Sequence, residues 1–296
     1  MTLSPISNAA LRAAREAMSP LLAEWTAKPE LHALCILSSS AENPDNLTRF
    51  DQESDFDVAI VLDVPMRAGE WRPHLDDTCA LIADRIPDWV PDFAFWIQVP
   101  WGSMEVNAHQ LIYQYECDPR TRWTGEKCDV FLHKSDVLCD RDGSFQALVR
   151  DKAQAAQAQL VRERDRLANR ITWDVREMSL RQARRLGPEA GHFLLNRAVD
   201  EVIDCVYATA GLFVPNNKWK LHQLSSRELI DARQAVLLRE ALRCDPACHA
   251  DLERRVGALE SFCAQAEGLA TSGPDAQEVR RRYQRTLQLK PPPGRP

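Results

Sequence analysis

Two aspartates separated by one residue form the most informative pair of side chains in this 296-residue chain. Asp55 and Asp57 stand at the head of the apolar run 58–62, whose short length and β-branched residues predict a strand. Side chains alternate along a strand with a period of two, so both carboxylates project to the same face. Because two neighbouring carboxylates repel each other unless a cation lies between them, the pair predicts a site for a divalent metal ion. Mg²⁺ suits the site, since it binds proteins through one or two carboxylates together with phosphate oxygens.

Three consecutive serines precede this pair in the chain. Ser38, Ser39 and Ser40 follow the compact apolar run 31–37, which predicts a buried strand that ends in a turn. Successive backbone N–H groups in a turn can hold phosphate groups, and serine hydroxyls add donors. The three serines are therefore candidate nucleotide-binding residues, with Ser39 as the first choice for the phosphate contact.

The elements that must position these residues change character near residue 144. Before it, short apolar strands mix with helices, whereas after it every periodic segment is helical. The expected helices are 9–28, 73–86 and a connecting helix at 147–170, and the expected strands are 31–37, 58–62, 93–99 and 105–115. The sequence thus predicts an α+β protein with a mixed-sheet domain at 1–143, an all-α helical-bundle domain at 144–290 and a disordered tail at 291–296.

The order strand, serine turn, loop, Asp-x-Asp and strand resembles the polymerase-β-like nucleotidyltransferase superfamily. Within that superfamily the chain is most similar to the aminoglycoside nucleotidyltransferases of the kanamycin-modifying kind, over 34–116 and more weakly over 196–222. Ser38-Ser39 stand where the family has Gly-Ser, and the polar loop that follows is longer than the family's. The resemblance implies a catalytic nucleotidyltransferase domain followed by a helical substrate-binding domain.

A third metal-binding carboxylate on a later strand is also implied by the resemblance. Glu105 fits this role, because the Glu-Val-Asn that begins there is similar to the same three residues in kanamycin-type enzymes. By alternation Asn107 and His109 share its face of the strand. Asp92 and Glu116 are the alternative ligands. Glu105, together with Asp55 and Asp57, would hold one or two Mg²⁺ ions.

Nucleotidyl transfer needs a base that takes the proton of the attacking hydroxyl. The segment 200–204 resembles the acidic, apolar helix of the family whose last acid is the base, so Asp204 is the candidate and Asp200 and Glu201 are the alternatives. A plain solvated helix face, with Arg197 paired to Glu201 four residues on, is an equal interpretation.

A basic turn with one tryptophan follows that helix. Lys218, Trp219 and Lys220 stand close together there, and Lys218 is the first candidate to neutralise a triphosphate as a point charge. An exposed basic turn over a buried tryptophan is the alternative.

The composition of the chain indicates which classes of partner are not expected. The net charge is −6, with 37 Lys and Arg against 43 Asp and Glu, so no overall basic field attracts a phosphate backbone, and nucleic acid is not expected as the main substrate. No signal peptide and no apolar run long enough for a membrane span are visible, which favours a cytoplasmic protein without a membrane partner. Of nine cysteines, Cys244 and Cys248 lie close together, but no second pair completes a zinc site, so reduced cysteines are expected.

These observations predict a metal-dependent nucleotidyltransferase that moves a nucleoside monophosphate, AMP from ATP or that of another nucleoside triphosphate, onto a hydroxyl of a small molecule such as an aminoglycoside-like antibiotic. One alternative is a catalytically weak nucleotide-binding or antitoxin-like module of the same fold. Another is a nucleotidyltransferase that acts on protein or tRNA. The sequence leaves open whether a homodimer forms and shares one site.

Overall fold

The computed structural model describes residues 5–42, 49–64, 93–173, 175 and 178–265. The predicted helix 73–86, the alternative ligand Asp92 and the predicted tail 291–296 lie outside these residues. By its contacts the chain divides into two compact units, Met1–Gln157 with Pro215–Arg227 and Ala158–Val214 with Glu228–Pro296. We call them the sheet unit and the helical unit. The domain ranges given above, which follow expected function, stay a prediction.

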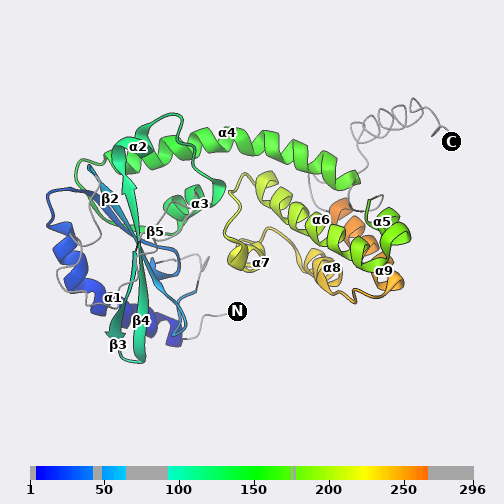
Figure 1. Cartoon of the computed structure of the whole chain (residues 1–296), viewed down its shortest axis with the longest axis horizontal. Coiled ribbons are helices and arrows are strands. Elements are labelled where there is room, and N and C mark those ends of the chain that lie inside the picture. Colours follow the sequence, from blue (N-terminus) through cyan, green and yellow to red (C-terminus); the bar gives the residue numbers. More distant parts are fainter. Residues whose placement is uncertain (1–4, 43–48, 65–92, 174, 176–177, 266–296) are drawn as a thin grey trace, which may run out of the picture. The chain divides into compact units, whose positions relative to one another are not determined.

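Five strands in the order β3-β4-β2-β1-β5 form the centre of the sheet unit (Figure 1). They are β1 (Leu31–Leu37), β2 (Phe56–Leu62), β3 (Phe93–Val99), β4 (Gly102–Ile112) and β5 (Ser135–Asp140). β2 and β4 run parallel, and the other three neighbouring pairs are antiparallel. A mixed sheet followed by helices confirms the predicted α+β class.

One face of the sheet carries the hydrophobic core of this unit. α1 (Pro5–Thr26) packs there and buries Met18 and Trp25 completely. Phe56 of β2 and Val106 of β4 belong to the same core and have no exposed surface. Because side chains alternate along each strand, the residues next to these in sequence face the other side of the sheet. The core therefore fixes which face of β2 and β4 is left for chemistry.

The observed strands differ from the expected ones at four places, one of which is the start of β4 at Gly102, three residues before the predicted 105. β2 begins two residues earlier than the predicted 58, and β4 ends at Ile112, where the short helix α2 (Tyr113–Cys117) starts. The strand β5 was not expected, because its sequence Ser-Asp-Val-Leu-Cys-Asp is half polar and lacks a buried face. It lies at the edge of the sheet, where such a composition is tolerated.

Of the remaining helices, the one predicted at 147–170 is present and begins three residues earlier, at 144. α4 (Ser144–Trp173) starts at the residue where the sequence changes character, and α6 (Pro188–Thr209) starts with its proline, which is suited to the first turn. The others are α3 (Gly125–His133), α5 (Ser179–Leu186), α7 (Asn217–Ser226), α8 (Ala232–Leu242) and α9 (His249–Gln265). None of the helices in the described ranges is both long and apolar enough to cross a membrane.

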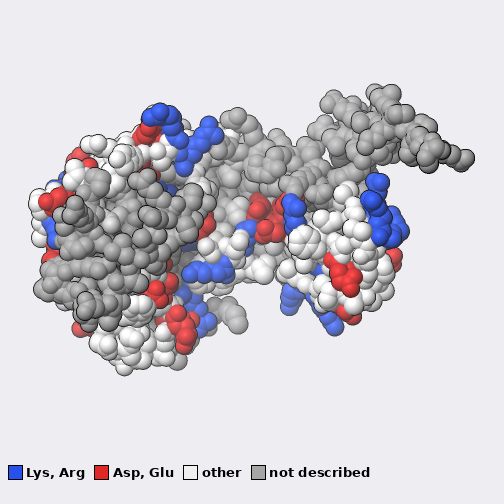
Figure 2. Space-filling view, viewed as in Figure 1, with Lys and Arg blue, Asp and Glu red and all other residues white. Residues whose placement is uncertain are grey.

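Acidic and basic side chains are interspersed over the described part of the face shown in Figure 2.

In the helical unit, α5 packs on α6 and α8 packs on α9, while α6 and α9 also contact each other. Leu195 and Val202 of α6 and Leu252 and Leu259 of α9 have no exposed surface. The predicted helical character of this part of the chain is confirmed.

Candidate functional site

The two aspartates lie at the beginning of β2, beside the parallel strand β4. In the register of these strands Asp57 is opposite Asn107, whereas Phe56 is opposite Val106 in the core. Asp57 and Asn107 therefore lie on the face of the sheet that points away from that core. The side-chain amide of Asn107 donates a hydrogen bond of 2.9 Å to Asp55 Oδ2, so the loop aspartate is also tied to β4.

Glu105 lies on β4 two residues before Asn107, and so on the same face of the strand. Its partner on β3 is Trp96, whose side chain is 44% exposed. The charge of Glu105 is near enough to Asp57 to raise the pKa of that carboxyl group. The structure thus brings the three predicted carboxylates to one end of two parallel strands.

The pKa of Asp57 is raised from 3.8 to about 7. Burial is the largest cause, because it removes water that would stabilise the anion, and the charge of Asp55 comes next. Lys218 and the hydrogen bond from Asn107 act in the opposite direction, and Glu105 adds a smaller increase. Burial and a neighbouring carboxylate together therefore disfavour the charged form of Asp57.

The serine turn holds the aspartate segment in place. Ser40 is fully buried, and its hydroxyl accepts a hydrogen bond of 3.1 Å from the Asp57 N–H and donates one of 3.3 Å to the Asp55 carbonyl oxygen. Ser38 has a φ of 54°, which glycine adopts more easily than serine, and its N–H donates to the Lys134 carbonyl oxygen at 2.8 Å. The turn is thus adjacent to the carboxylates, whereas the role of Ser38, Ser39 and Ser40 as phosphate ligands stays a prediction.

Helix α7 belongs to the sheet unit although it follows α6 in the chain. Its N-cap residue Asn216 accepts a hydrogen bond of 3.0 Å from the Lys218 N–H and donates one of 2.7 Å to Glu126 on α3. At the other end, Arg227 donates to Asp129 of α3 at 3.0 Å. Both ends of α7 are therefore fastened to the same helix.

Asp129 connects the attachment of α7 on α3 with the serine turn. Its carboxylate is fully buried and also accepts a hydrogen bond from the Lys134 ammonium group. Lys134 in turn accepts the Ser38 N–H through its backbone carbonyl. A short network thus connects α7, α3 and the serine turn within the sheet unit.

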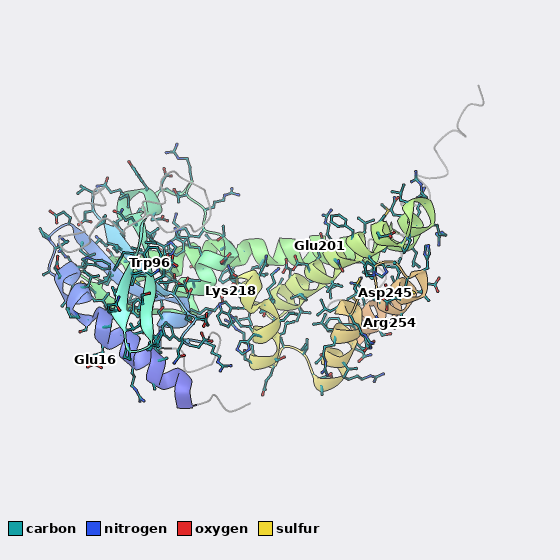
Figure 3. The ribbon with its side chains drawn as sticks, turned by 60° about the horizontal axis from the view of Figure 1, so that its bottom comes forward. Glu16, Trp96, Glu201, Lys218, Asp245 and Arg254 are labelled. Atoms are coloured by element: carbon teal, nitrogen blue, oxygen red, sulfur yellow. The ribbon has the colours of Figure 1, made fainter. Side chains whose placement is uncertain are left out.

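Lys218 stands in the first turn of α7, where Figure 3 labels it. Its positive charge lowers the pKa of Asp57 and so partly offsets the neighbouring carboxylates. The structure therefore places the predicted lysine near the acidic group.

Glu116 is separate from this group of carboxylates. It is buried, and it accepts hydrogen bonds from Trp123 Nε1 at 2.5 Å and from Lys127 Nζ at 2.9 Å. Its charge is therefore used to hold α2 against α3, which leaves Glu105 as the better third ligand.

Asp204 lies on α6 of the helical unit and is partly buried. On the same helix Arg197 and Glu201 form an ion pair of 3.9 Å, as the solvated-face interpretation predicts, and Asp200 is exposed. The catalytic role of Asp204 stays a prediction.

The carboxylate group has the donor set that Mg²⁺ prefers, since all its ligand atoms are oxygens. The raised pKa of Asp57 also fits a cation, which would relieve the repulsion between the carboxylates. Among the described residues, tight triads of ligand atoms occur elsewhere, at His192, Cys244 and Asp251 and at His32, Asp140 and Asp142. The ligand atoms of Asp55, Asp57 and Glu105 do not all lie within 4.8 Å of one another, so their joint binding of a metal ion stays a prediction.

Sequence reasoning missed the residues that fasten α7. Asn216 and Glu126 are 90 residues apart, and Arg227 and Asp129 are 98 residues apart. Local patterns carry no information about such pairs. The one available signal was the N-cap, because asparagine directly before a helix is a common start signal.

No protein-family model matches this chain, and the search of curated proteins gives no match. A solved structure, the nucleotidyltransferase-like protein from Exiguobacterium sibiricum 255-15, aligns with a TM-score of 0.40 and 12% identity over 92% of this chain and 80% of that chain. A TM-score at this level is too low to carry an argument about function. What the site can do is therefore inferred from its own residues.

Proposed function

We propose that this protein is a metal-dependent nucleotidyltransferase of the polymerase-β-like superfamily, which moves AMP from ATP, or the equivalent group of another nucleoside triphosphate, to a hydroxyl of a small molecule. The observation that carries the proposal is the setting of Asp57, whose pKa is raised by burial first and then by the charges of Asp55 and Glu105, and lowered by Lys218. Concentrated carboxylates suit a divalent cation, and a lysine beside them suits the phosphates that such a cation binds.

Each residue of the site has a role in this proposal. Asp55, Asp57 and Glu105 would hold one or two Mg²⁺ ions, which supply stabilisation of the charge on the attacked phosphate and on the departing pyrophosphate. Lys218 would bind the triphosphate. Ser39 would contact a phosphate group, while Ser38 shapes the turn and Ser40 fixes the Asp-x-Asp backbone through its two hydrogen bonds.

The proposed transfer is a substitution at phosphorus. The acceptor's hydroxyl oxygen forms a bond to the α-phosphorus, the bond between that phosphorus and the bridging oxygen breaks, and pyrophosphate leaves. Asp204 of the helical unit would take the hydroxyl proton. An aminoglycoside-like acceptor is proposed because 34–116 resembles the kanamycin-type enzymes, and the net charge of −6 is compatible with a polycationic substrate.

The test measures Mg²⁺-dependent pyrophosphate release from ATP with a panel of hydroxyl-bearing acceptors that includes aminoglycosides. Asp55→Asn and Asp57→Asn should each reduce release by about 100-fold or more, because each removes a ligand of the metal that stabilises the transition state. Glu53→Gln is the matched control, since this exposed side chain lies two residues before the pair. Full release by either aspartate variant would exclude the metal role.

A nucleotide-binding module without turnover is the second candidate. It is favoured by Ser38, whose left-handed backbone stands where the resembling family has glycine and whose N–H is already bonded within the protein. Equilibrium binding of Mg²⁺ and a non-hydrolysable ATP analogue, together with the release assay, separates the two. Tight binding that needs Asp55 and Asp57, without pyrophosphate release for any acceptor, would favour the module.

A further inference from the structure

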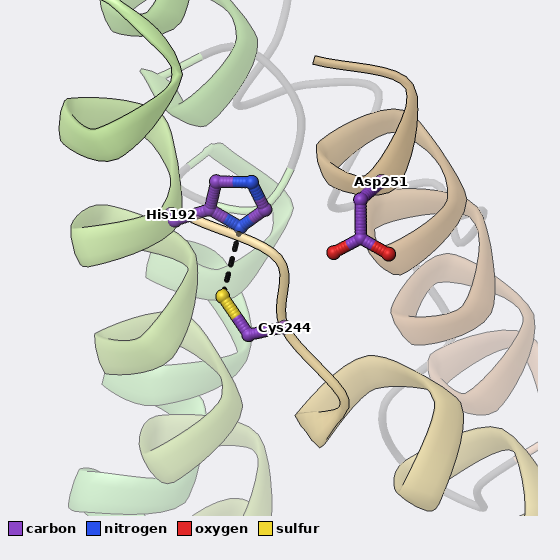
Figure 4. Close-up of side chains that lie close together, drawn as sticks. All are labelled: His192, Cys244 and Asp251. Carbon is purple, nitrogen blue, oxygen red and sulfur yellow. Dashed lines mark hydrogen bonds between the residues drawn. The ribbon is translucent and has the colours of Figure 1, made fainter. Parts of the chain in front are cut away.

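The helical unit contains a second cluster of reactive groups, centred on Cys244 in the loop between α8 and α9. Its sulfur lies 3.4 Å from Nδ1 of His192 and 3.1 Å from Nη1 of Arg255. Figure 4 shows His192 and Cys244 facing each other, with Asp251 of α9 nearby. Cys244 is an exposed cysteine, so a reagent from solution can reach it.

Arg255 brings a positive charge into this cluster from within the unit. Its side chain has no exposed surface. Its nitrogens donate to the Ala241 carbonyl oxygen at 2.7 Å, to Asn196 Oδ1, and to the cluster residues His192 and Cys244. No carboxylate within the described ranges forms an ion pair with Arg255. A buried charge is costly without a counter-ion, and the sulfur of Cys244 is the one bonded atom that can become an anion.

The directions of the hydrogen bonds around His192 also favour a thiolate at Cys244. A guanidinium group only donates, so His192 Nδ1 must accept the bond of 2.7 Å from Arg255. The ring's other nitrogen, Nε2, then carries the hydrogen and donates to the Cys248 carbonyl oxygen at 3.2 Å. Because the single lone pair of Nδ1 is already used, it is a poor acceptor for a thiol hydrogen. The Cys244 sulfur instead accepts an N–H from Arg255, which favours the thiolate.

Bound cations are a weaker interpretation of the same cluster. The ligand atoms of His192, Cys244 and Asp251 do lie within 4.8 Å of one another. However, Arg255 already occupies both the His192 nitrogen and the sulfur with its own positive charge. Asp251 is bonded to Arg254 at 2.6 Å and to the Asp245 N–H at 2.8 Å, and Figure 3 labels both of these partners.

Other charged groups near the cluster largely pair with one another. Arg254 of α9 bridges Asp251 and Glu240 of α8, so the charge of Asp251 is shared with a cation that does not contact Cys244. From α6, the titratable group that faces the sulfur is His192. Arg255 is the positive charge that contacts the sulfur, and the charge of Asp251 also acts on this arginine.

We propose that Cys244 is a reactive thiolate, paired with the buried guanidinium of Arg255, and that it is a site of covalent modification in the helical unit by electrophiles and hydroperoxides. With an alkyl halide, sulfur forms a bond to carbon and the halide leaves with the bonding electrons. With a hydroperoxide, sulfur attacks the terminal oxygen, the O–O bond breaks, sulfur is oxidised to the sulfenic acid, which keeps the proton of the attacked oxygen, and the departing hydroxide or alkoxide takes a proton from water.

The test compares two exposed cysteines in the same intact protein. Iodoacetamide alkylation of Cys244 and Cys117 is followed by peptide mass spectrometry from pH 5.5 to 9. An ordinary thiol with a pKa near 8.5 loses about tenfold in rate for each pH unit below that value. We expect the alkylation rate of Cys244 to fall much less steeply with decreasing pH than that of Cys117. Parallel pH profiles for the two residues would overturn the proposal.

Two variants identify the source of the effect. Arg255→Lys keeps a cation and should keep the alkylation rate of Cys244 at pH 7 within about threefold, whereas Arg255→Met should lower it by about tenfold or more, since thiolate fraction sets the rate. Arg254→Lys is the matched control, because that residue does not contact the sulfur. If Arg255→Met does not fold, thiolate absorbance near 240 nm provides the test. This absorbance should be present in the wild type and weaker in Cys244→Ser, and identical spectra of the two proteins would refute the thiolate.

Discussion

Asp57 is the residue whose electrostatic setting departs most clearly from that of an ordinary surface aspartate. Its raised pKa means that the folded protein binds a proton at this carboxyl group more tightly than the unfolded chain does. The free energy of unfolding should therefore fall as the pH rises from about 4 to 7, because the folded state must then hold an uncompensated anion. A site that costs stability at neutral pH in this way is typical of function.

Replacing the Asp57 carboxylate by an amide should remove the loss of unfolding free energy at neutral pH. We expect Asp57→Asn without metal to be more stable than the wild type at pH 8, by the order of 2–4 kcal/mol, and to differ little at pH 4. Urea unfolding in the presence of a chelator measures both values. Glu53→Gln serves as the control, since its exposed carboxylate should show neither effect. Equal destabilisation of Asp57→Asn at both pH values would contradict the assigned charge burial.

Lys218 should affect both the binding of ATP and the pKa of Asp57. Lys218→Ala should raise the KM for ATP by about tenfold, equivalent to about 1.4 kcal/mol, because a phosphate contact is lost. It should also move the acidic limb of the pH–rate profile to higher pH, since Lys218 lowers the pKa of Asp57. Arg120→Ala removes a largely exposed cation that pairs with Asp118, and should change neither quantity. A change in KM without the shift in pH profile would place Lys218 away from Asp57.

At the scale of elements, α7 depends on its two attachments to α3. Arg227→Leu removes a partner of the buried Asp129, and breaking a buried pair typically costs about 3–5 kcal/mol. We expect a comparable loss of stability or somewhat less, because Lys134 still pairs with that carboxylate. Thermal unfolding together with the KM for ATP tests this. Asn216→Ala should mainly raise KM, since it loosens the end of α7 that carries Lys218.

Arg239→Leu is the comparison for that experiment. It removes an arginine whose hydrogen bond, from Nε to the Ala235 carbonyl oxygen, stays within α8 of the helical unit. Neither stability nor KM should change by much. If Arg227→Leu behaved like Arg239→Leu, the network through Asp129 would have no role in holding α7.

How far the sequence predicts these elements depends on whether the signal is local. The strands around the Asp-x-Asp pair are predicted because 31–37 and 58–62 are apolar and bounded by turn residues, and the Glu105 face follows from alternation alone. β5 escapes prediction because an edge strand needs no apolar pattern. The position of α7 beside the carboxylates also escapes, since it depends on contacts between residues about a hundred positions apart.

For the whole molecule, the separation of core and site allows a test by metal removal. The core of the sheet unit lies against α1, on the opposite face of β2 from Asp57. Chelation with EDTA should therefore abolish pyrophosphate release while the far-UV circular dichroism spectrum stays unchanged. Readdition of Mg²⁺ should restore release. Collapse of the spectrum on chelation would mean that a metal holds the fold together.

The path of the chain between the units has a consequence for recombination. The chain leaves the sheet unit after Gln157, returns at Pro215 and leaves again after Arg227. A single genetic crossover that exchanged everything after Gln157 for a foreign helical module would also discard Lys218 and the attachments of α7. On the proposed function, in which the helical unit binds the acceptor, new acceptor specificity would have to arise by substitutions within 158–214 and 228–296, or by an exchange that spares α7.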